Sequence, residues 1–359
     1  MMPTNAVTEQ VTTEVQPRTR VRSMPEYHPP LGQRDRLRLD FNENTLACSP
    51  AVKAALERIS AAELTRYPER EPVEALAASH LGLNPGQVIL TNGVDEAIHV
   101  LCQAFLDSGD EVLLPVPTYT MYEIYASATD ATLRKIRAGA DLQFPFEALL
   151  GAINPRTKII AIANPNSPTG CVASREQILT IAEAAPHALV LVDEAYFHFY
   201  GQTVMDLIGK VPNLVVARTF SKAYGLAALR LGLLAASEPM QRWIRRVISP
   251  YSVNSIALVA LTAALEDQSY LDWYVGEVKQ ARAEFLSGLT QLGLQFWPTE
   301  ANFVLVNIGA VHREFVAAMR DDGILVRDRS ADPGCDGCVR ITIGTREQMR
   351  TALHVVENF

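Results

Sequence analysis

The sequence predicts an α/β protein with a mainly parallel sheet between two layers of helices and a second, smaller α+β unit. Short apolar runs, typical of buried parallel strands, alternate with helical patterns over residues 88–235. After Met240 long helical patterns dominate, for example over 270–292, and two further apolar runs cover 302–306 and 339–343. The first block therefore predicts the large sheet, and the second predicts the small unit.

The segments that precede the sheet are expected to form an arm. Residues 1–22 are polar and indicate a flexible tail. Residues 37–41 alternate between apolar and polar side chains, which indicates a short strand, and residues 50–59 form an amphipathic pattern that begins at a proline, which indicates a helix. We expect an N-terminal arm with part of the small domain at 23–66, the large domain at 67–245, and a linking helix with the rest of the small domain at 246–359.

Within the large domain each candidate strand is a short apolar run. A helix is predicted directly after the first run, because apolar residues recur at i, i+3, i+4 and i+7 from Ile98 to Phe105. The candidate strands cover 88–91, 111–114, 158–163, 189–192, 214–217 and 231–235.

Composition and charge narrow the class of protein. The chain has 359 residues, of which 48% are hydrophobic and 20% are charged, as in globular rather than disordered or fibrous proteins. The net charge of −8 gives no support for binding nucleic acid or an anionic membrane surface, so an anionic ligand needs a local cluster of cations and amides. No apolar run approaches the roughly 18 residues that span a bilayer, and there is no secretory signal, so we expect a cytoplasmic protein with no membrane partner.

The five cysteines do not indicate a disulfide framework, because their number is odd and their density is low. Cys335 and Cys338 form a CxxC pair, but no second pair with zinc-ligand spacing accompanies it. We therefore expect a glycine-rich loop with two incidental thiols, and no metal site.

A lysine follows the apolar run 214–217, within Thr219-Phe220-Ser221-Lys222-Ala223-Tyr224-Gly225. A lysine at the end of a buried strand loses solvation, which lowers its pKa and makes the neutral amine available. The neutral amine is the form that condenses with an aldehyde to a Schiff base. Lys222 is therefore a candidate nucleophile, and the alternative is a solvated lysine in a surface loop.

An acid pair, Asp193-Glu194, ends the apolar run 189–192, at the kind of strand end where open α/β sheets bind ligands. A buried aspartate needs a partner, which a protonated ring nitrogen would supply. A metal-binding carboxylate of the nucleotide-hydrolase type needs a GxxxxGK[ST] loop upstream, and this chain has none. A helix N-cap is the other alternative for this motif.

Two more strand ends carry polar loops. Thr91-Asn92-Gly93-Val94-Asp95-Glu96 places a glycine turn at a helix start, whose free N–H groups suit a phosphate, and the alternative is a plain glycine turn. Asn164-Pro165-Asn166-Ser167-Pro168-Thr169-Gly170 has a shape held by two prolines, which can aim an asparagine at a ligand, and the alternative is again a plain turn.

The four segments, in this order, resemble those of the class I and II aminotransferases, which are fold-type I pyridoxal-phosphate enzymes, and more narrowly the histidinol-phosphate aminotransferase branch of that family. The resemblance implies a large cofactor-binding domain and a small domain built from the N- and C-terminal segments. The matching stretches are these four together with 39–44, 66–68, 117–119, 326–329 and 338–345.

The resemblance implies which residues contact the cofactor ring. Lys222 would form the Schiff base with pyridoxal 5′-phosphate and then carry the substrate proton, and Asp193 would keep the ring nitrogen protonated. Because Ser167 adjoins Asn166, it stays open which of the two faces the ring. The other ring contacts would be stacking by Tyr119 and hydrogen bonds to the phenolic oxygen from Tyr196 and Asn166.

The resemblance also implies the anion contacts. Tyr67 would reach the cofactor phosphate of a neighbouring copy, which implies a homodimer. The cofactor phosphate of the same chain would be bound by Gly93, Val94, Asp95, Ser221 and Arg230. The anionic end of the substrate would be held by Arg327 and Arg340, and the residues closing over it would be Tyr27 and Asn42.

The implied reaction moves the amino group of histidinol phosphate to 2-oxoglutarate, which yields imidazole-acetol phosphate and glutamate, a step of histidine biosynthesis. The partners would be a small amino donor and a 2-oxo acid, and the paired arginines favour a phosphate-bearing donor. The alternatives are an aromatic amino-acid aminotransferase, a decarboxylase of a phosphorylated amino acid, and a cofactor-sensing regulator. A regulator needs a DNA-binding module, for which residues 1–22 are too short.

Overall fold

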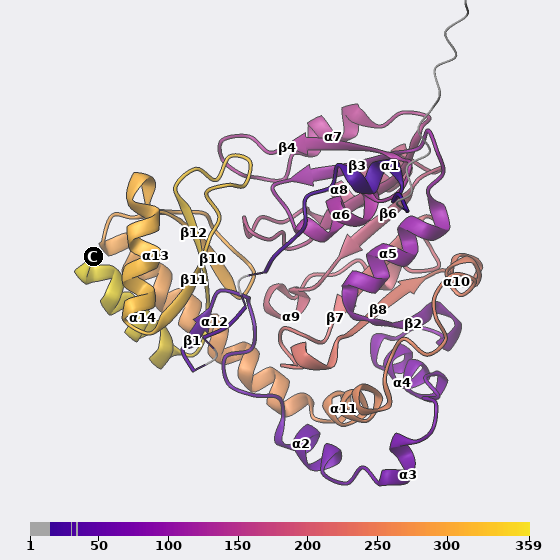
Figure 1. The fold of residues 1–359 in the computed structure, drawn as a ribbon, viewed down its shortest axis with the longest axis horizontal. Coiled ribbons are helices and arrows are strands. Elements are labelled where there is room, and N and C mark those ends of the chain that lie inside the picture. The colour runs from indigo at the N-terminus through magenta and orange to yellow at the C-terminus, as the bar shows by residue number, and fades with distance from the viewer. Residues whose placement is uncertain (1–14, 30, 34) are drawn as a thin grey trace, which may run out of the picture.

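The computed structural model describes residues 15–29, 31–33 and 35–359, and it contains two sheets with their helices. Figure 1 shows the large sheet on the right and the small sheet on the left, with the long helix α12 (Gln268–Gln291) running from the base of the large unit to the small one.

The large sheet has seven strands in the order β2-β8-β7-β6-β5-β3-β4. Strand β8 runs antiparallel to both of its neighbours, and all other pairs are parallel, which confirms the mainly parallel sheet. The strands are β2 (Val88–Asn92), β3 (Glu111–Val116), β4 (Thr132–Arg137), β5 (Thr157–Ala163), β6 (Leu189–Asp193), β7 (Leu214–Thr219) and β8 (Leu231–Ala236).

The central strands are apolar throughout because they face a core on each side. In β6, Val190 and Val192 belong to one core, and Leu189 and Leu191 belong to the other. One core includes residues of α7 (Phe146–Ala152), α8 (Arg175–Ala184) and α9 (Phe197–Tyr200). The opposite core includes residues of α5 (Gly93–Phe105), α6 (Thr120–Ser127) and α10 (Glu238–Ile244).

The small sheet has the order β1-β11-β12-β10-β9. Its edge strand β1 (Leu37–Leu39) pairs in parallel with β11 (Ile324–Asp328), so the N-terminal arm completes a sheet made otherwise of C-terminal residues. The other strands are antiparallel, and the covering helices pack on one another; these elements are β9 (Gln295–Phe296), β10 (Phe303–Asn307), β12 (Cys338–Thr342), α13 (His312–Asp321) and α14 (Arg346–Asn358).

The remaining helices lie along the arm and at the base of the large unit. Helix α11 (Ser255–Glu266) packs against α2 (Pro50–Leu56) and α4 (Glu71–Leu81). The short helices α1 (Thr19–Arg22) and α3 (Ala61–Leu64) complete the set. Part of the tail proposed for 1–22 lies outside the described residues, and the domain boundaries proposed from the sequence stay predictions.

All six candidate strands of the large domain are confirmed, as are the helices expected at 50–59 and 270–292. Strand β4 was not predicted. It lies at the edge of the sheet beside β3, and four of its six residues are exposed, so burial does not demand an apolar run there. Among the described residues no helix is both long and apolar enough to cross a bilayer.

We expect Gly232→Ala to destabilise the protein. Gly232 lies on β8 opposite the start of α5, and an added Cβ would lie 2.7 Å from the carbonyl carbon of Gly93 and 2.8 Å from the amide nitrogen of Val94. Because these are backbone atoms of a buried turn, we expect a loss of about 2 kcal/mol or more in the free energy of unfolding, measured by urea denaturation.

The matched control is Gly151→Ala, because an added Cβ at Gly151 meets no atom within 4 Å. Gly151 lies in α7, so this change should be neutral or stabilising by up to about 1 kcal/mol. Equal destabilisation by the two substitutions would contradict the close approach of β8 to the helix start.

Candidate functional site

The polar segments singled out in the sequence meet at one edge of the large sheet. The parallel strands β5, β6 and β7 all end there, so the loop 164–170, Asp193 and Lys222 lie along the same edge. The arm faces this edge, since Lys222 Nζ donates a hydrogen bond to the carbonyl of Phe41 at 2.8 Å. The candidate site therefore lies between the large sheet and the arm.

Lys222 has the electrostatics expected of an available amine. Burial lowers its pKa below the usual range of a lysine; Tyr196 opposes this, and the positive charge of Arg340 adds to it. Among the described residues no carboxylate forms an ion pair with Lys222 Nζ. The prediction of a desolvated lysine at a strand end is confirmed.

Asp193 is held by two donors. Its Oδ1 accepts a hydrogen bond from the backbone N–H of Ala195 at 3.0 Å, and its Oδ2 accepts one from the hydroxyl of Tyr122 at 2.5 Å. Burial raises the pKa of Asp193 to about 6, although both hydrogen bonds act in the opposite direction. A buried carboxylate of this kind suits a protonated nitrogen as its partner.

The sequence reasoning missed Tyr122. This tyrosine is buried in α6, and its hydroxyl is the only side-chain donor to Asp193 among the described residues. Its spacing in the sequence could have indicated it, because Tyr122 lies three residues after Tyr119 and therefore on the same helical face. The ring of Tyr119 meets that of Tyr122 edge-on, with centroids 6.1 Å apart.

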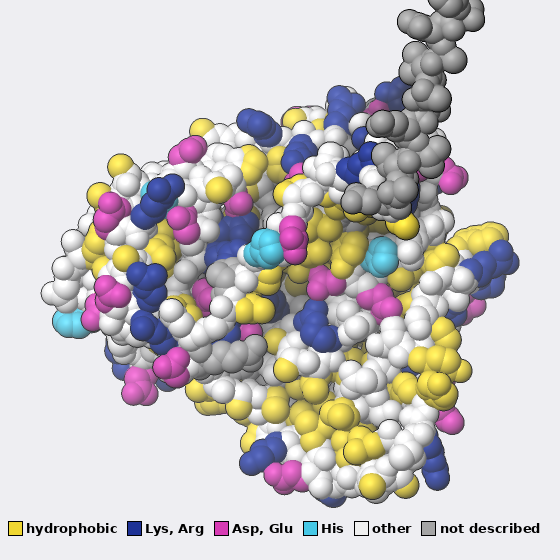
Figure 2. Space-filling model, in the orientation of Figure 1, with side chains coloured by type: hydrophobic (Ala, Val, Ile, Leu, Met, Phe, Trp, Pro, Cys, Tyr) yellow, Lys and Arg dark blue, Asp and Glu magenta, His cyan; other side chains and the backbone are white. Residues whose placement is uncertain are grey.

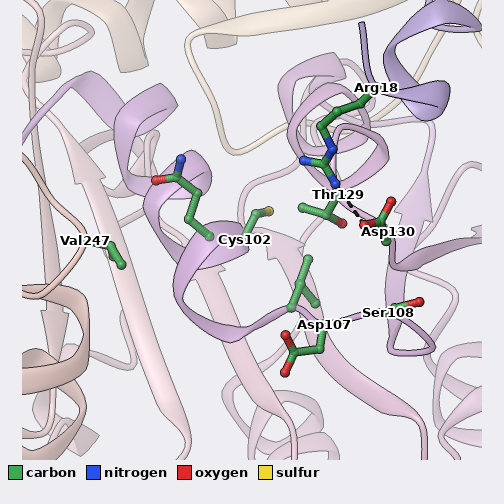
Figure 3. A pocket seen from close by; sticks show the side chains of 9 residues that line it. Arg18, Cys102, Asp107, Ser108, Thr129, Asp130 and Val247 are labelled. Carbon is green, nitrogen blue, oxygen red and sulfur yellow. Dashed lines mark hydrogen bonds and ion pairs between the residues drawn. The ribbon is translucent and has the colours of Figure 1, made fainter.

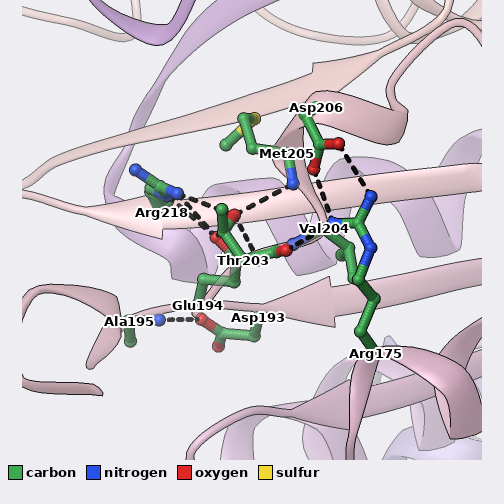
Figure 4. Close-up of polar contacts among 9 residues, drawn as sticks. All are labelled: Arg175, Asp193, Glu194, Ala195, Thr203, Val204, Met205, Asp206 and Arg218. Atoms are coloured by element: carbon green, nitrogen blue, oxygen red, sulfur yellow. Dashed lines mark hydrogen bonds and ion pairs between the residues drawn. The ribbon is translucent and has the colours of Figure 1, made fainter. Parts of the chain in front are cut away.

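The second acid of the pair serves the fold instead. Figure 4 shows Glu194 in a polar cluster with Thr203 and Arg218, and the Arg218 Nη2 to Glu194 Oε2 distance is 2.8 Å. The backbone N–H of Val204 and the hydroxyl of Thr203 also donate to this carboxylate. Neighbouring strand residues point to opposite faces, so Asp193 reaches the site while Glu194 anchors the segment that follows α9.

Tyr196 is held from the small unit. Asn42 Nδ2 donates to the Tyr196 hydroxyl oxygen at 2.9 Å, and Thr342 Oγ1 donates to Asn42 Oδ1 at 3.1 Å. Asn42 itself has a φ of +55°, in the left-handed region that asparagine tolerates better than most residues. The structure thus places Asn42 against Tyr196, where it orients the phenol and leaves the phenolic proton free to donate.

The glycine turn at the start of α5, for which the sequence predicts an anion site, lies against Arg230. Gly93 has a φ of +74°, and an added Cβ there would lie 2.7 Å from Arg230 Nη2. Arg230 pairs with Asp95 at 2.9 Å, and its charge acts on Lys222, the residue after Ser221. The free N–H groups of the helix start and the guanidinium of Arg230 therefore lie together, as a phosphate site requires.

Two tyrosines lie beside this turn, and a third does not. The Tyr119 hydroxyl donates to Asp95 Oδ1 at 2.8 Å, and Tyr27 is among the groups that raise the pKa of Tyr119, which places it nearby. Tyr67 has no contact with these residues in its own chain: it is 78% exposed and stacks on Tyr251 with ring centroids 4.6 Å apart.

Arg340 and Arg327 lie side by side in β12 and β11, where they are paired in register. Arg340 is 8% exposed, and its Nη2 donates to the carbonyl of Asp40. Its Nε has no hydrogen-bond partner, and no carboxylate pairs with it among the described residues. Arg327 is only half-buried and lies 5.8 Å from the centre of the Phe41 ring. As cross-strand partners, the two side chains lie on the same face of the small sheet, and Arg340 is the more buried of the two.

The loop 164–170 separates the two neighbours that the sequence left ambiguous. The side-chain amide of Asn166 bonds inside the large unit, to Thr118, Pro117 and Thr169. Ser167 instead accepts a hydrogen bond from Arg340 Nη1 at 2.9 Å. Of the two, Ser167 is the residue that bonds to Arg340.

A cavity of about 490 Å³ lies at the far end of α5, away from these groups. Figure 3 shows Arg18 reaching toward Asp130 across its wall, at 3.0 Å, with Cys102 and Asp107 nearby. Since α5 starts at the glycine turn and ends at this cavity, the two places are separated by the length of the helix.

The residues of the site fit pyridoxal 5′-phosphate, the group that the resemblance implies. The cradle at Gly93 and Arg230 suits its phosphate, Asp193 suits a protonated ring nitrogen, and Lys222 suits its aldehyde. The unpartnered Nε of Arg340 leaves capacity for an anionic substrate group beside them.

Comparisons with known proteins show the family and the fold. The family model for aminotransferase class I and II matches residues 34–356. A histidinol-phosphate aminotransferase of Geobacillus sp. (strain WCH70) is 36% identical, over 94% of this chain and 96% of that protein, and one of Anoxybacillus flavithermus is 35% identical over 90% and 88%. The crystal structure of a histidinol-phosphate aminotransferase from Sinorhizobium meliloti in complex with pyridoxal-5'-phosphate shares the fold, with a TM-score of 0.86 at 24% identity over 97% of this chain and 100% of that one.

The raised pKa of Asp193 predicts a pH-dependent stability of the cofactor-free protein. The folded state holds this proton up to pH about 6, whereas the unfolded chain releases it near pH 3.8, so stability falls as the pH rises through this window. Relative to Asp193→Asn, the free energy of unfolding of the unsubstituted protein should fall by about 2 kcal/mol between pH 4.5 and 7.5, measured with urea.

Tyr122→Phe provides the control for this assignment. It removes a hydrogen bond that lowers the pKa of Asp193, so it should shift the decline to higher pH and make it larger. An identical pH dependence in the unsubstituted and the Asp193→Asn proteins would show that Asp193 is not the titrating group.

Proposed function

Because the chain belongs to the class I and II aminotransferase family and is therefore a transaminase, we propose that it transfers the amino group of histidinol phosphate to 2-oxoglutarate, with pyridoxal phosphate as cofactor. The products are imidazole-acetol phosphate and glutamate, and the step belongs to histidine biosynthesis. The family match supports the reaction type, and the curated relatives support the substrate. The observation that carries the proposal is the buried guanidinium of Arg340, which forms no ion pair with a carboxylate of the described residues and acts on the amine of Lys222.

Pyridoxal phosphate, when bound, supplies an aldehyde that takes up an amino group and a ring that accepts electrons from the carbon losing its proton. Lys222 Nζ supplies the amine that anchors the group, and it moves the substrate proton because its lowered pKa lets it exist without a charge. Asp193 would keep a proton on the ring nitrogen, and Tyr122 and the N–H of Ala195 fix the orientation of its carboxylate.

The remaining residues orient the reactants. Tyr196, held by Asn42, would donate its phenolic proton to an oxygen of the cofactor, and Tyr119 would stack on the ring. The glycine turn with Ser221 and Arg230 holds the cofactor phosphate. The deep Arg340 and the shallower Arg327 bind the anionic groups of the two substrates, one a phosphate ester and the other a dicarboxylic acid.

The working form that we propose is a homodimer in the cytoplasm. Exposed apolar side chains, namely Leu64 at 60%, Tyr67 at 78% and Tyr251 at 56%, supply surface for a second copy. Figure 2 shows hydrophobic side chains gathered over the region that Figure 1 labels α2, α3 and α11. Tyr67 is exposed and has no contact with the site of its own chain, which suits a role in the partner's site.

All five cysteines are free thiols, as in proteins of a reducing compartment, which supports the cytoplasm as the location.

The substrate assignment is tested by comparing amino donors. The purified protein should prefer histidinol phosphate to phenylalanine. Arg327→Ala and Arg340→Ala should each lower kcat/KM for histidinol phosphate, which corresponds to a loss of about 2 to 4 kcal/mol in transition-state stabilisation, because each removes one guanidinium from a charge pair. Both variants should keep the cofactor absorption band, since its phosphate is held by other residues.

A preference for phenylalanine would favour an aromatic amino-acid aminotransferase instead. Release of carbon dioxide from a phosphorylated amino acid would favour a decarboxylase. Normal turnover of histidinol phosphate by both arginine variants would remove the arginines from the proposal.

The dimer is tested by complementation. Lys222→Ala removes the amine of a chain's own site, and Tyr67→Ala removes the side chain that the chain contributes to its partner's site. Each variant alone should therefore be badly impaired. Mixed after unfolding and refolding, hybrid dimers should regain activity through one intact site per pair. Confirmed hybrids without activity would disprove the shared site, and unfolding and refolding each variant alone is the control.

A further inference from the structure

We propose that Cys335 and Cys338 are a redox-sensitive pair: a peroxide converts their two thiols to a disulfide, and this change at the start of β12 weakens substrate binding by Arg340 on the same strand. The thiol chemistry does not depend on the proposed reaction, and only the effect on substrate binding rests on the proposed function. The spacing of the two cysteines alone indicated incidental thiols, whereas their arrangement in the fold favours a reactive pair.

A tight turn holds the two cysteines at the spacing that a disulfide needs. The backbone N–H of Cys338 donates to the carbonyl of Cys335 at 2.9 Å, and Gly337, the third residue of the turn, has a φ of +72°. A hydrogen bond between the first and fourth residues is typical of a β-turn, whose end Cα atoms lie less than about 7 Å apart. Disulfides join Cα atoms that lie about 4.4 to 6.8 Å apart, so the two sulfur atoms can bond without a large movement of the backbone.

The two thiols differ in acidity. A hydrogen bond between the two side chains, together with burial, raises the pKa of Cys335. The same hydrogen bond lowers the pKa of Cys338, although burial acts in the opposite direction. Cys335 therefore keeps its proton and donates it, and Cys338 has more thiolate character. The thiolate is the form that attacks an oxidant, and a second cysteine beside it can complete a disulfide.

The pair lies directly beneath the surface of the small unit. Both cysteines are buried, and they share an apolar cluster with Leu142 and Trp297. Gly334 and Asp336, the two chain neighbours of Cys335, are exposed. Local opening of a surface loop of this kind gives a small oxidant such as a peroxide access to both sulfur atoms.

The oxidation balances with hydrogen peroxide as the oxidant. The Cys338 thiolate attacks one peroxide oxygen, the O–O bond breaks, and the leaving hydroxide takes up the proton that Cys338 released and becomes water. The Cys335 sulfur then attacks the sulfenic acid at Cys338: the S–S bond forms, the S–O bond breaks, and the oxygen leaves with the Cys335 proton as a second water. The two thiols are oxidised and the peroxide is reduced, and a dithiol reductant reverses the change.

Strand β12 connects the pair to the candidate site. Cys338 and Arg340 are two residues apart on this strand, so their side chains point to the same face. An S–S bond is about 2.05 Å long, shorter than any contact between unbonded sulfur atoms, so its formation draws Cys338 toward Cys335. Arg340 is oriented by acceptors outside its own strand, Ser167 Oγ and the carbonyl of Asp40. A shift of β12 against these acceptors therefore misplaces the guanidinium.

The test treats the purified, cofactor-loaded protein with hydrogen peroxide and then maps its peptides. The tryptic peptide 330–340 contains both cysteines, and we expect it to become lighter by two hydrogen atoms and to regain them with dithiothreitol. In the oxidised protein the KM for histidinol phosphate should rise about 5-fold or more and recover on reduction. The cofactor absorption band should stay, since the cofactor is held by other residues.

Serine variants test the roles of the two sulfur atoms. Cys335→Ser keeps the attacking sulfur, so dimedone, which traps sulfenic acids, should label Cys338, whereas Cys338→Ser should leave Cys335 unlabelled. Neither variant can form the disulfide, so neither should show the reversible rise in KM. The matched control is Cys48→Ser, which removes a half-buried thiol of the arm and should respond to peroxide as the unsubstituted protein does. If a serine variant does not fold, the alanine variant at that position replaces it.

A peptide 330–340 that keeps both thiols in peroxide overturns the inference, as does a disulfide there that leaves the KM unchanged. A reversible rise in KM that persists in both serine variants would belong to other groups and would also overturn it. Failure of the proposed function is a separate outcome, because the disulfide is detected without substrate. A protein that forms it but prefers another amino donor would retain the redox pair, with the KM measured for that donor.

Discussion

The site depends on the amine of Lys222 and the guanidinium of Arg340, neither of which forms an ion pair with a carboxylate within the described part of the chain. Arg340 and Lys222 donate to the consecutive carbonyls of Asp40 and Phe41, and the positive charge of Arg340 contributes to the lowered pKa of Lys222. Burial lowers the pKa of Arg340 to about 10 and also lowers that of Lys222. An anionic ligand would relieve both costs, so the proposed site suits an anion although the overall charge of the protein is negative.

This constraint also explains why the small unit and the arm are needed. Strand β1 brings residues 40–42 to the edge of the large sheet, where their backbone and side chains bind Arg340, Lys222 and Tyr196. Arg340 itself comes from β12, on the small sheet. Lys222 and Tyr196, the candidate site residues of the large domain, are therefore contacted by residues more than a hundred positions away in the chain.

The acid pair at the end of β6 shows how one local motif serves two purposes. Asp193 lies in the site with a pKa raised to about 6, because burial outweighs its two donors. Glu194, on the opposite face, is saturated by Arg218, Thr203 and the N–H of Val204. Successive residues of a strand point to opposite faces, so Glu194 can pair with Arg218 while Asp193 faces the candidate site.

The sequence by itself determined the strands of the large sheet and the loops at their ends. The central strands are buried on both faces and must be apolar, and the carboxyl ends of parallel strands meet at one edge, so Lys222, Asp193 and the glycine turn could be placed together. The edge strand β4, by contrast, has four exposed residues of six, so its sequence contains no apolar run that would predict a strand.

Only the tertiary structure decided which side chains meet. Tyr122 bonds to Asp193 across 71 positions of sequence, and Ser167 bonds to Arg340 across 173. Asn166 and Ser167 are adjacent polar residues whose order carries no information about direction, because the fold of the loop turns one toward Thr118 and the other toward β12. Periodicity and local motifs describe neighbours along the chain, whereas these contacts depend on how distant elements pack.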